Sequence, residues 1–257
     1  MNNMSERVER WKGRHRGKDA LRHDIWAQLE NSGAAVTNPW STIPNFVGAA
    51  EAARRLTSLP SWDAARVVKC NPDAAQAPLR LLALQAGKRV YTPVPELVAD
   101  FPYLLLDPDE LCSRGIAFED VMYSDGAMRH GKRCSFADVE ALDFFVVGCV
   151  AVTRGGGRTG KGAGFADLEM GLFRHYGCIR PTTPVVTTVH DIQIVADERV
   201  VMQAHDNPLD WIATPSELIA THTRHPTPGP INWQALQQDQ FEDIPFLRAL
   251  MNELQGA

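Results

Sequence analysis

A run of nine apolar residues, residues 144–152, constrains the fold of this chain more than any other feature. Read as a strand, it is apolar on both faces, and that pattern is typical of a sheet covered on both sides. A glycine-rich stretch follows, in which five of the eight residues 155–162 are glycine. A helical pattern then covers residues 165–176. The sequence therefore predicts a buried strand, a glycine loop and a helix in direct succession.

Shorter strand and helix patterns alternate along the rest of the chain, and we find no internal repeat. Strands are expected at residues 65–70, 88–93, 99–106 and 185–195. Helices are expected at residues 18–33, 48–58, 79–86, 136–142, 215–221 and 244–254, with a short one opening at Pro108. This alternation predicts an α/β fold: a mostly parallel sheet, helices on both faces, and ligands at the carboxyl ends of the strands.

Length and composition limit the classes of protein that fit. The 257 residues are 44% hydrophobic, so we expect residues 18–257 to form a single α/β domain behind a mobile basic lead-in, residues 1–17. A net charge of −5 disfavours a nucleic-acid partner, and no apolar run is long enough to span a membrane. Five cysteines without a CxxC pair favour a reducing compartment. We expect a cytoplasmic protein, a monomer or homodimer.

The glycine loop has the composition of a phosphate site. Glycine lets the backbone approach a ligand closely, so the N–H groups of Gly160, Gly162 and Gly164 and the following helix N-terminus can bind an anion. Arg158 and Lys161 add mobile positive charge. The spacing nearly matches a P-loop, but glycine stands at position 162, where a Ser or Thr would reach Mg²⁺. The spacing does not match the dinucleotide fingerprint either. The alternative is a flexible loop that binds nothing.

Residues 157–167 resemble the nucleotide-loop motif of the 5-formyltetrahydrofolate cyclo-ligase family, also called methenyltetrahydrofolate synthetases. That motif is G-R-x-G-x-G-x-G-[YF]-Y-D-R. Residues 205–214, HDNPLDWIAT, are similar to the family's C-terminal H-D-x-P-[ML]-D-x-[IV]-[IV]-T segment. A weaker match is the Lys18-x-x-Leu21-Arg22 pattern, similar to an N-terminal helix whose Lys and Arg reach ATP phosphates. The matches occur in family order and span roughly residues 18–222.

The chain departs from the family pattern beside Asp167. Ala166 and Leu168 stand where the family has Tyr and Arg. Residues 164–169, 43–49 and 69–73 look more like a divergent branch, the proteins named for containing a methenyltetrahydrofolate synthetase domain. The resemblance therefore supports the fold and a phosphate site more firmly than the ligase activity.

The resemblance implies an ATP-dependent ligase that forms a C–N bond. The implied reaction cyclises 5-formyltetrahydrofolate, a reduced folate, to 5,10-methenyltetrahydrofolate with release of ADP and phosphate, and uses ATP and Mg²⁺. The resemblance also implies a cyclo-ligase-like fold, an architecture shared with sugar-phosphate isomerases and CoA-transferases. The implied site residues are Arg158 and Lys161 for catalysis; Lys18, Arg22, Gly157, Arg158, Gly160, Lys161, Gly162 and Gly164 for ATP; Asp167 for Mg²⁺; and Phe165, His205, Asp206 and Asp210 as site-lining residues.

Several alternatives stay open. Asp167 fits a helix-capping role as well as a magnesium role, because both place a carboxylate at the start of a helix. Glu169, two residues further on, is expected to be a solvated side chain. The protein as a whole could bind a nucleotide or folate without ligase activity, which the missing Tyr and Arg suggest. A second alternative is a sugar-phosphate isomerase or CoA-transferase-like enzyme, because fold alone does not decide chemistry.

Overall fold

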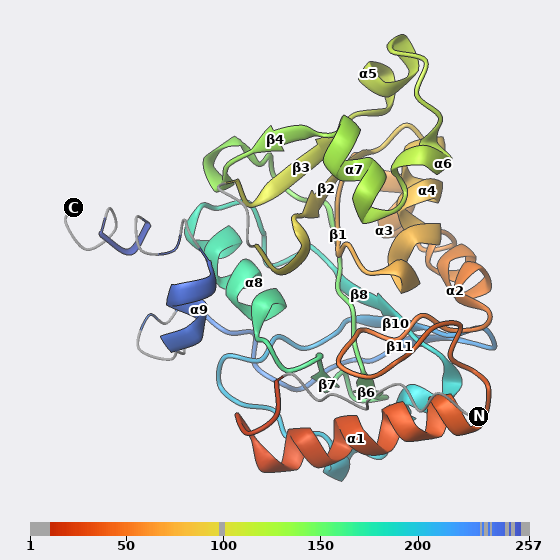
Figure 1. Ribbon diagram of the computed structural model, residues 1–257, viewed down its shortest axis with the longest axis vertical. Coiled ribbons are helices and arrows are strands. Elements are labelled where there is room, and N and C mark those ends of the chain that lie inside the picture. Colours follow the sequence, from red (N-terminus) through yellow and green to blue (C-terminus); the bar gives the residue numbers. More distant parts are fainter. Residues whose placement is uncertain are drawn as a thin grey trace, which may run out of the picture.

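The computed structural model describes residues 11–97, 101–231, 233, 236, 238–244, 247 and 250–252 (Figure 1). Its strands are β1 (Val67–Cys70), β2 (Arg89–Pro93), β3 (Tyr103–Leu106), β4 (Lys132–Cys134), β5 (Phe144–Val146), β6 (Ala151–Thr153), β7 (Arg158–Thr159), β8 (Val185–Thr188), β9 (Ile194–Val195), β10 (Trp211–Ala213) and β11 (Leu218–Ala220). Its helices are α1 (Arg16–Asn31), α2 (Ala49–Leu56), α3 (Pro60–Ala64), α4 (Ala77–Gln85), α5 (Pro108–Ser113), α6 (Phe118–Val121), α7 (Ser124–His130), α8 (Phe165–His175) and α9 (Gln238–Asp243).

Eight strands form the main sheet, in the order β11-β10-β8-β5-β1-β2-β3-β4. The central strands β10, β8, β5, β1 and β2 run parallel, whereas β11 at one edge and β3 and β4 at the other are antiparallel to their neighbours. Three further strands form a smaller sheet in the order β7-β6-β9. The mostly parallel α/β sheet expected from the sequence is therefore confirmed.

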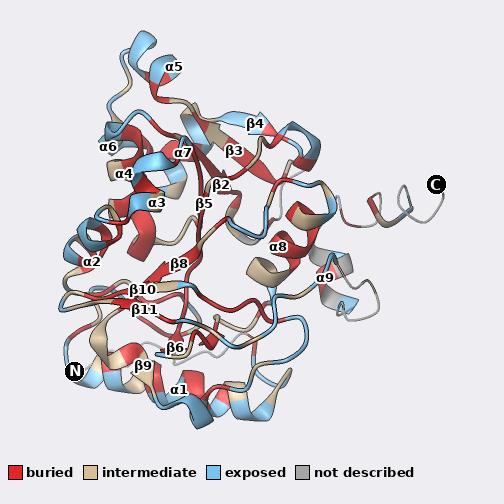
Figure 2. Ribbon diagram, turned by 180° about the vertical axis from the view of Figure 1, so that it is seen from behind, coloured by how far each residue is buried: buried red, intermediate tan, exposed pale blue. Residues whose placement is uncertain are grey.

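Successive side chains of the central strands enter two separate cores. Val68 and Phe144 pack in a cluster with residues of α1, α2 and α4 on one face of the sheet. Val67 and Phe145 pack with residues of α8 on the other face. Figure 2 shows the buried strands lying between α2, α3 and α4 on one side and α8 on the other. Helices cover both faces, which explains why the strand pattern is apolar throughout.

The prediction of one long strand over residues 144–152 is wrong, because the chain passes from the main sheet to the smaller sheet within this segment. β5 ends at Val146 in the main sheet, and β6 begins at Ala151 in the smaller sheet. The bend passes close to another segment, since a Cβ on Gly148 would lie 2.9 Å from Ile43 Cγ1. The strand expected at residues 185–195 divides in the same way, into β8 and β9. β5 and β6 are both fully buried, so the apolar pattern continues across the first break.

Two expected helices also differ from the structure. Residues 215–221 contain strand β11, in which Ile219 pairs with Ile212 of β10 at the sheet edge. Residues 136–142 form only a 3₁₀ turn, Phe136–Asp138, which begins with a capping box at Ser135. The helix expected at residues 244–254 lies partly outside the described residues.

The part of the basic lead-in that the structure describes, residues 11–17, contacts the glycine loop. Trp11 is buried, and its ring meets that of Phe165 edge-on with 5.7 Å between centroids. Arg14 donates to the carbonyl of Ala163 at 2.7 Å. The domain boundary at residue 17 stays a prediction.

Within the described part of the chain, every helix is too short or too polar to cross a bilayer.

Candidate functional site

The glycine loop connects the smaller sheet to α8 and places the N-terminus of that helix at the site. Gly164, with a φ of +77°, is the N-cap of α8. Gly162 has a φ of +115°, and a Cβ there would lie 2.7 Å from Trp11 Cβ. Both positions therefore need glycine. The first amides of an α-helix lack partners within the helix, so the start of α8 presents N–H donors beside the loop.

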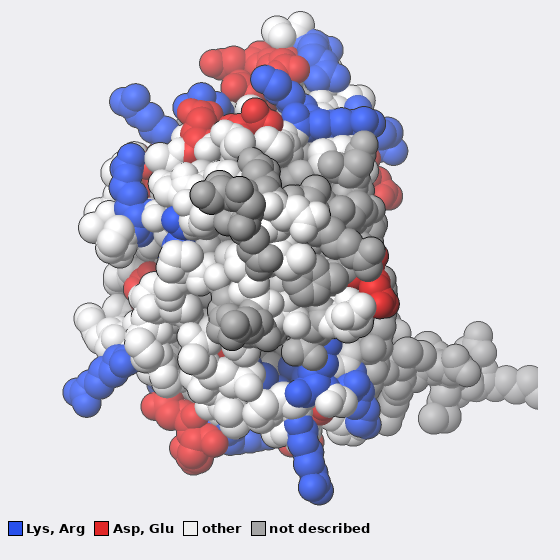
Figure 3. Space-filling view, turned by 90° about the vertical axis from the view of Figure 1, so that its left-hand side faces the viewer, with Lys and Arg blue, Asp and Glu red and all other residues white. Residues whose placement is uncertain are grey.

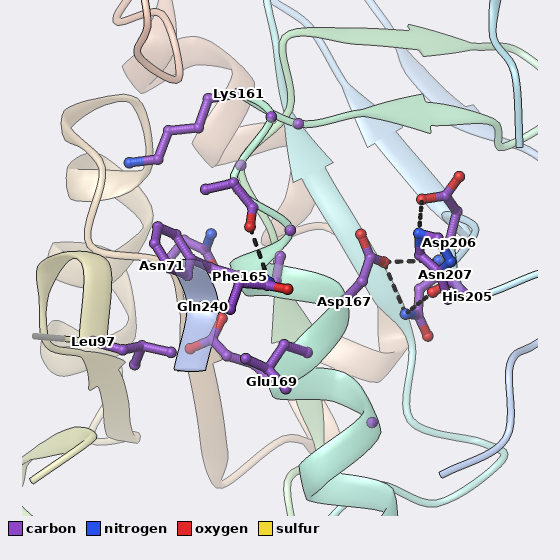
Figure 4. Close-up of a pocket in the computed structure, with 18 of the residues that line it drawn as sticks. Asn71, Leu97, Lys161, Phe165, Asp167, Glu169, His205, Asp206, Asn207 and Gln240 are labelled. Carbon is purple, nitrogen blue, oxygen red and sulfur yellow. Dashed lines mark hydrogen bonds and ion pairs between the residues drawn. The ribbon is translucent and has the colours of Figure 1, made fainter. Parts of the chain in front are cut away.

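These donors face a cavity of about 680 Å³, a size typical of small-molecule sites. Figure 4 shows Asn71 and Leu97 on one side of the first turns of α8, and Asp167, Asp206 and Asn207 on the other. The lining comes from α1, the glycine loop, α8, residues 203–207 and residues 228–231, with residues 71–74 and 93–95 opposite. Figure 3 views the side of α8 and α9 and shows Lys and Arg side chains gathered on the lower part of that face.

Helix α1 brings both of its predicted phosphate ligands, Lys18 and Arg22, to the cavity wall. Lys18 forms an ion pair with Asp206. Arg22 pairs with Asp19 at 2.5 Å, and its guanidinium also donates to the carbonyl of Gly160 at 3.3 Å. Helix α1 therefore fastens the glycine loop to the segment that carries Asp206. Binding of ATP by the two cations stays a prediction.

Arg158 is a fixed, buried group, so the expectation of a mobile cation is wrong at this position. Its side chain is 2% exposed and forms an ion pair with Asp167. Its Nε donates to the carbonyl of Asn207 at 2.8 Å. Burial would lower the pKa of Arg158, but the charge of Asp167, its hydrogen bond and the charges of Cys149 and Asp206 together outweigh burial and raise that pKa above its ordinary value. Arg158 holds the glycine loop against residues 203–207.

Asp167 receives several donors on one carboxylate oxygen. The amide N and the side-chain Nδ2 of Asn207 each donate to its Oδ1 at 2.9 Å, beside the ion pair with Arg158. Burial would raise the pKa of Asp167, but the positive charge of Arg158 and the hydrogen bonds from Asn207 hold it below its ordinary value. Figure 4 shows the second oxygen directed away from Asn207.

Whether Asp167 can act as a Mg²⁺ ligand depends on this second carboxylate oxygen. Within the described part of the chain no group of three or more His, Cys, Asp or Glu side chains could form a metal site. Mg²⁺ commonly takes only one or two carboxylates and completes its shell with water and substrate phosphates. Asp167 fits such a site as a single ligand through its second oxygen.

The ion pair of Asp167 has a testable consequence for the pH dependence of stability. Because the folded-state pKa lies below the value in the unfolded chain, the stabilisation is complete above about pH 4 and is lost as pH falls through the folded-state pKa. We expect Asp167→Asn to lower the free energy of unfolding by about 2 kcal/mol at pH 7. We expect this difference from wild type to shrink below pH 4.

Urea denaturation of both proteins between pH 3 and pH 7 measures this difference. Asp24→Asn is the matched control, because Asp24 pairs with Arg199 at the surface, where the two side chains are 53% and 39% exposed. An exposed pair contributes little, so the control should follow wild type at every pH. A difference between Asp167→Asn and wild type that stays constant over the whole range would contradict the assignment.

Glu169 is buried, so the expectation of a solvated side chain is wrong. Its Oε2 accepts from Lys69 Nζ at 2.9 Å, and its Oε1 accepts from the Tyr103 hydroxyl at 2.6 Å. Lys69 also donates to Asn71 Oδ1 at 2.5 Å and lies 4.4 Å from the centre of the Phe145 ring. This network forms the cavity wall opposite Asp167 and fixes the orientation of the Asn71 carboxamide.

The structure places most, but not all, of the predicted site residues on the cavity. Phe165, His205 and Asp206 line it together with Arg158 and the loop residues from Gly160 to Gly164. Two predicted residues lie elsewhere. Gly157 belongs to the β6–β7 hairpin, where its N–H donates to Thr153 Oγ1 at 3.1 Å. Asp210 accepts from the Val185 amide at 2.8 Å, between β10 and β8.

Sequence reasoning missed other residues of the cavity: Asn71, Glu169, Arg174, Asn207 and Gln240. Asn71 and Asn207 both lie inside segments that match the family. Their positions in these motifs could have identified them as site residues. Arg174 lies seven residues after Asp167, close to two helical turns, and that spacing places both on one face of α8.

The chain has a mostly parallel α/β sheet with a glycine loop and a helix N-terminus at a cavity, an arrangement that is common among proteins that bind phosphate-bearing ligands. A family model described as the 5-formyltetrahydrofolate cyclo-ligase family matches residues 14–215. The chain therefore belongs to the 5-formyltetrahydrofolate cyclo-ligase family, and the resemblance seen in its motifs is confirmed.

Relatives of known sequence agree with this assignment. The chain is 35% identical over 235 residues to a methenyltetrahydrofolate synthase domain-containing protein of Mus musculus, and 33% identical over 242 residues to that of Bos taurus. These matches cover 91% and 93% of the chain, which spans 63% of the length of each relative. The NMR structure of Aquifex aeolicus 5,10-methenyltetrahydrofolate synthetase shares the fold, with a TM-score of 0.51 at 18% identity over 86% of this chain and 99% of that one.

Proposed function

We propose that the protein cyclises 5-formyltetrahydrofolate to 5,10-methenyltetrahydrofolate at the expense of ATP, with release of ADP and phosphate. Membership in the cyclo-ligase family supports a ligase of this kind. The observation that carries the proposal is that the glycine loop, Lys161 and Asp167 open onto the same cavity as the wall of Asn71 and Glu169. One end of that cavity suits a triphosphate, and the other offers room for an organic ring.

The proposed reaction needs positioning and neutralisation of charge more than covalent help from the protein. The formyl oxygen attacks the γ-phosphorus, the bond from that phosphorus to the bridging oxygen breaks, and ADP leaves. The folate N10 then attacks the resulting iminium carbon, the carbon–oxygen bond breaks, and phosphate leaves as N10 loses its proton. The amides at the start of α8 donate to the phosphate oxygens, and Lys161 neutralises charge that develops on the transferred group.

Each of the other predicted ligands has a definite part in this proposal. Lys18 and Arg22 extend the positive wall along α1, and Arg158 acts by holding the loop and Asp167 in place. Asp167 would hold Mg²⁺, which supplies charge neutralisation at the phosphate oxygens when bound. Reduced folate as the substrate, the cytoplasmic location and a monomeric or homodimeric state stay predictions.

A coupled assay tests the proposal. Purified protein is mixed with 5-formyltetrahydrofolate, ATP and Mg²⁺, and the absorbance of the methenyl product is followed. We expect product only when both substrates are present. Thermal unfolding with ATP–Mg²⁺ and with folate separately measures binding, because a ligand of the native state raises the melting temperature. Stabilisation by neither ligand, together with no product, would overturn the proposal.

One observation favours a second candidate, a protein that binds both ligands without catalysing their reaction. The family's Tyr and Arg are replaced by Ala166 and Leu168, and Leu168, a residue of α8, is 5% exposed and belongs to the core on that face of the sheet. Position 168 therefore contributes no charge to the cavity. Thermal stabilisation by both ligands without product formation would favour this candidate. Membership in the ligase family leaves a sugar-phosphate isomerase or CoA-transferase-like activity without support.

A further inference from the structure

The basic side chains that line the cavity differ in how their charge is balanced. Ion pairs within the protein neutralise three of them: Lys18 with Asp206, Arg22 with Asp19, and Arg158 with Asp167. Arg174 lines the same cavity, but its Nη1 is buried and makes no hydrogen bond to any described residue. Arg174 is therefore a cation of the cavity wall with unused donor capacity.

The position of Arg174 separates it from the phosphate end of the site. It lies in the last turn of α8, whereas the glycine loop meets the first turn. Arg174 is nine positions after Phe165, which corresponds to about 14 Å along the helix axis. The backbone of Arg174 therefore lies at the end of α8 away from the loop amides, beyond Asp167.

Arg174 lies beside a segment that closes this part of the cavity. Gly171, one turn before it, also lines the cavity, and a Cβ on Gly171 would lie 3.1 Å from Ile231 Cα. Residues 228–231 line the cavity as well. This segment therefore packs closely against α8 one turn before Arg174, where a side chain larger than glycine would be crowded.

Burial of this guanidinium without an ion pair is unfavourable. Desolvation lowers the pKa of Arg174, and the more distant charge of Asp167 only partly opposes that effect. Arginine nevertheless stays protonated in proteins, so the charge persists. An unpaired, partly desolvated cation is stabilised by an anionic partner, and a planar guanidinium matches a carboxylate through two parallel hydrogen bonds.

We propose that Arg174 binds a carboxylate of the substrate, at the end of the cavity away from the glycine loop. This inference rests on the proposed function, since the glutamyl tail of a reduced folate supplies such a carboxylate. The alternative source of an oxyanion is the nucleotide, whose phosphates we place at the opposite end of α8. Arg174 is then a specificity-determining residue that distinguishes folates with a glutamyl tail from those without one.

The test compares wild type with Arg174→Gln by isothermal titration. The ligands are 5-formyltetrahydrofolate, 5-formyltetrahydropteroate, which lacks the glutamyl group, and ATP–Mg²⁺. We expect Arg174→Gln to weaken binding of the folate by about 10- to 100-fold, the effect of a lost charge-assisted pair. Binding of the pteroate and of ATP–Mg²⁺ should change less than about twofold, because neither reaches Arg174.

Arg129→Gln is the matched control, because it makes the same change at an exposed position of α7 outside the cavity. The control should bind all three ligands as wild type does. Without ligand, Arg174→Gln should melt no lower than wild type, because it removes an unpaired charge, whereas a structural arginine would melt lower when replaced.

The outcomes separate the subsite from the proposed function. Equal loss of folate and pteroate binding, or weaker binding of ATP–Mg²⁺ alone, would overturn the carboxylate assignment. Folate binding that is unchanged in Arg174→Gln would overturn the subsite and leave the proposed function intact. A wild-type protein that binds no folate would overturn the proposed function and the subsite together.

Discussion

Replacement of Lys161 by alanine is expected to lower kcat of the proposed ligase reaction by about 10²- to 10³-fold, the usual cost of removing one group that stabilises developing charge. Lys161 lines the cavity between two glycines of the loop, and its Nζ lies 5.9 Å from the Phe165 ring centre at the start of α8. No ion pair between described side chains includes it. Its charge therefore remains available to a phosphate ligand.

The measurement is steady-state turnover with ATP and 5-formyltetrahydrofolate, together with thermal stabilisation by ATP–Mg²⁺. Lys132→Ala is the control, because Lys132 is exposed on β4, outside the cavity. We expect the control to match wild type and Lys161→Arg to recover part of the lost turnover. If Lys161→Ala kept wild-type turnover and nucleotide binding, the assignment of the glycine loop as the triphosphate site would fail.

The strand, loop and helix around the site could be predicted because each depends on local pattern. An apolar strand, a glycine-rich loop and the periodicity of residues 165–176 are visible in neighbouring residues, and the structure has α8 over Phe165–His175. Local pattern does not show which sheet a strand joins. The apolar residues after Val146 therefore did not reveal that the chain crosses to the smaller sheet.

Strand β11 shows how tertiary pairing overrides local preference. The proline at position 215 predicts the first turn of a helix, but Leu218, Ile219 and Ala220 pair with β10 at the edge of the main sheet. Residues 211–213 form the strand to which β11 pairs. The sequence pattern of residues 215–221 does not show that this partner strand lies beside them. Pairing across the fold therefore decided an element that sequence reasoning assigned to the wrong class.

The charge partners at the site were the hardest part to predict. Arg158 and Asp167 are nine residues apart, and Lys69 and Glu169 are one hundred residues apart. The sequence spacing alone predicts that Arg158 is a mobile cation and that Glu169 is a solvated carboxylate. Both are buried because an opposite charge from another element meets them, and a sequence without the fold does not show which charges will meet.

The buried pair of Lys69 and Glu169 carries the largest expected effect on stability. Lys69 is completely buried in β1, and the Glu169 side chain is 2% exposed in α8. We expect Lys69→Met to lower the free energy of unfolding by about 3–5 kcal/mol, because it leaves the Glu169 carboxylate buried with only the Tyr103 hydroxyl as a partner. Urea denaturation at pH 7 measures the change.

A double variant distinguishes loss of the ion pair from loss of packing. Lys69→Met combined with Glu169→Gln removes both charges and keeps a hydrogen-bond acceptor for Tyr103, so most of the lost stability should return. Arg89→Met is the control, because Arg89 pairs with Glu140 at the surface, where the side chains are 39% and 40% exposed. Its cost should be below about 1 kcal/mol. If the effects of the two substitutions at positions 69 and 169 simply added, the cavity wall would depend on packing, and Asn71 would not owe its orientation to the ion pair.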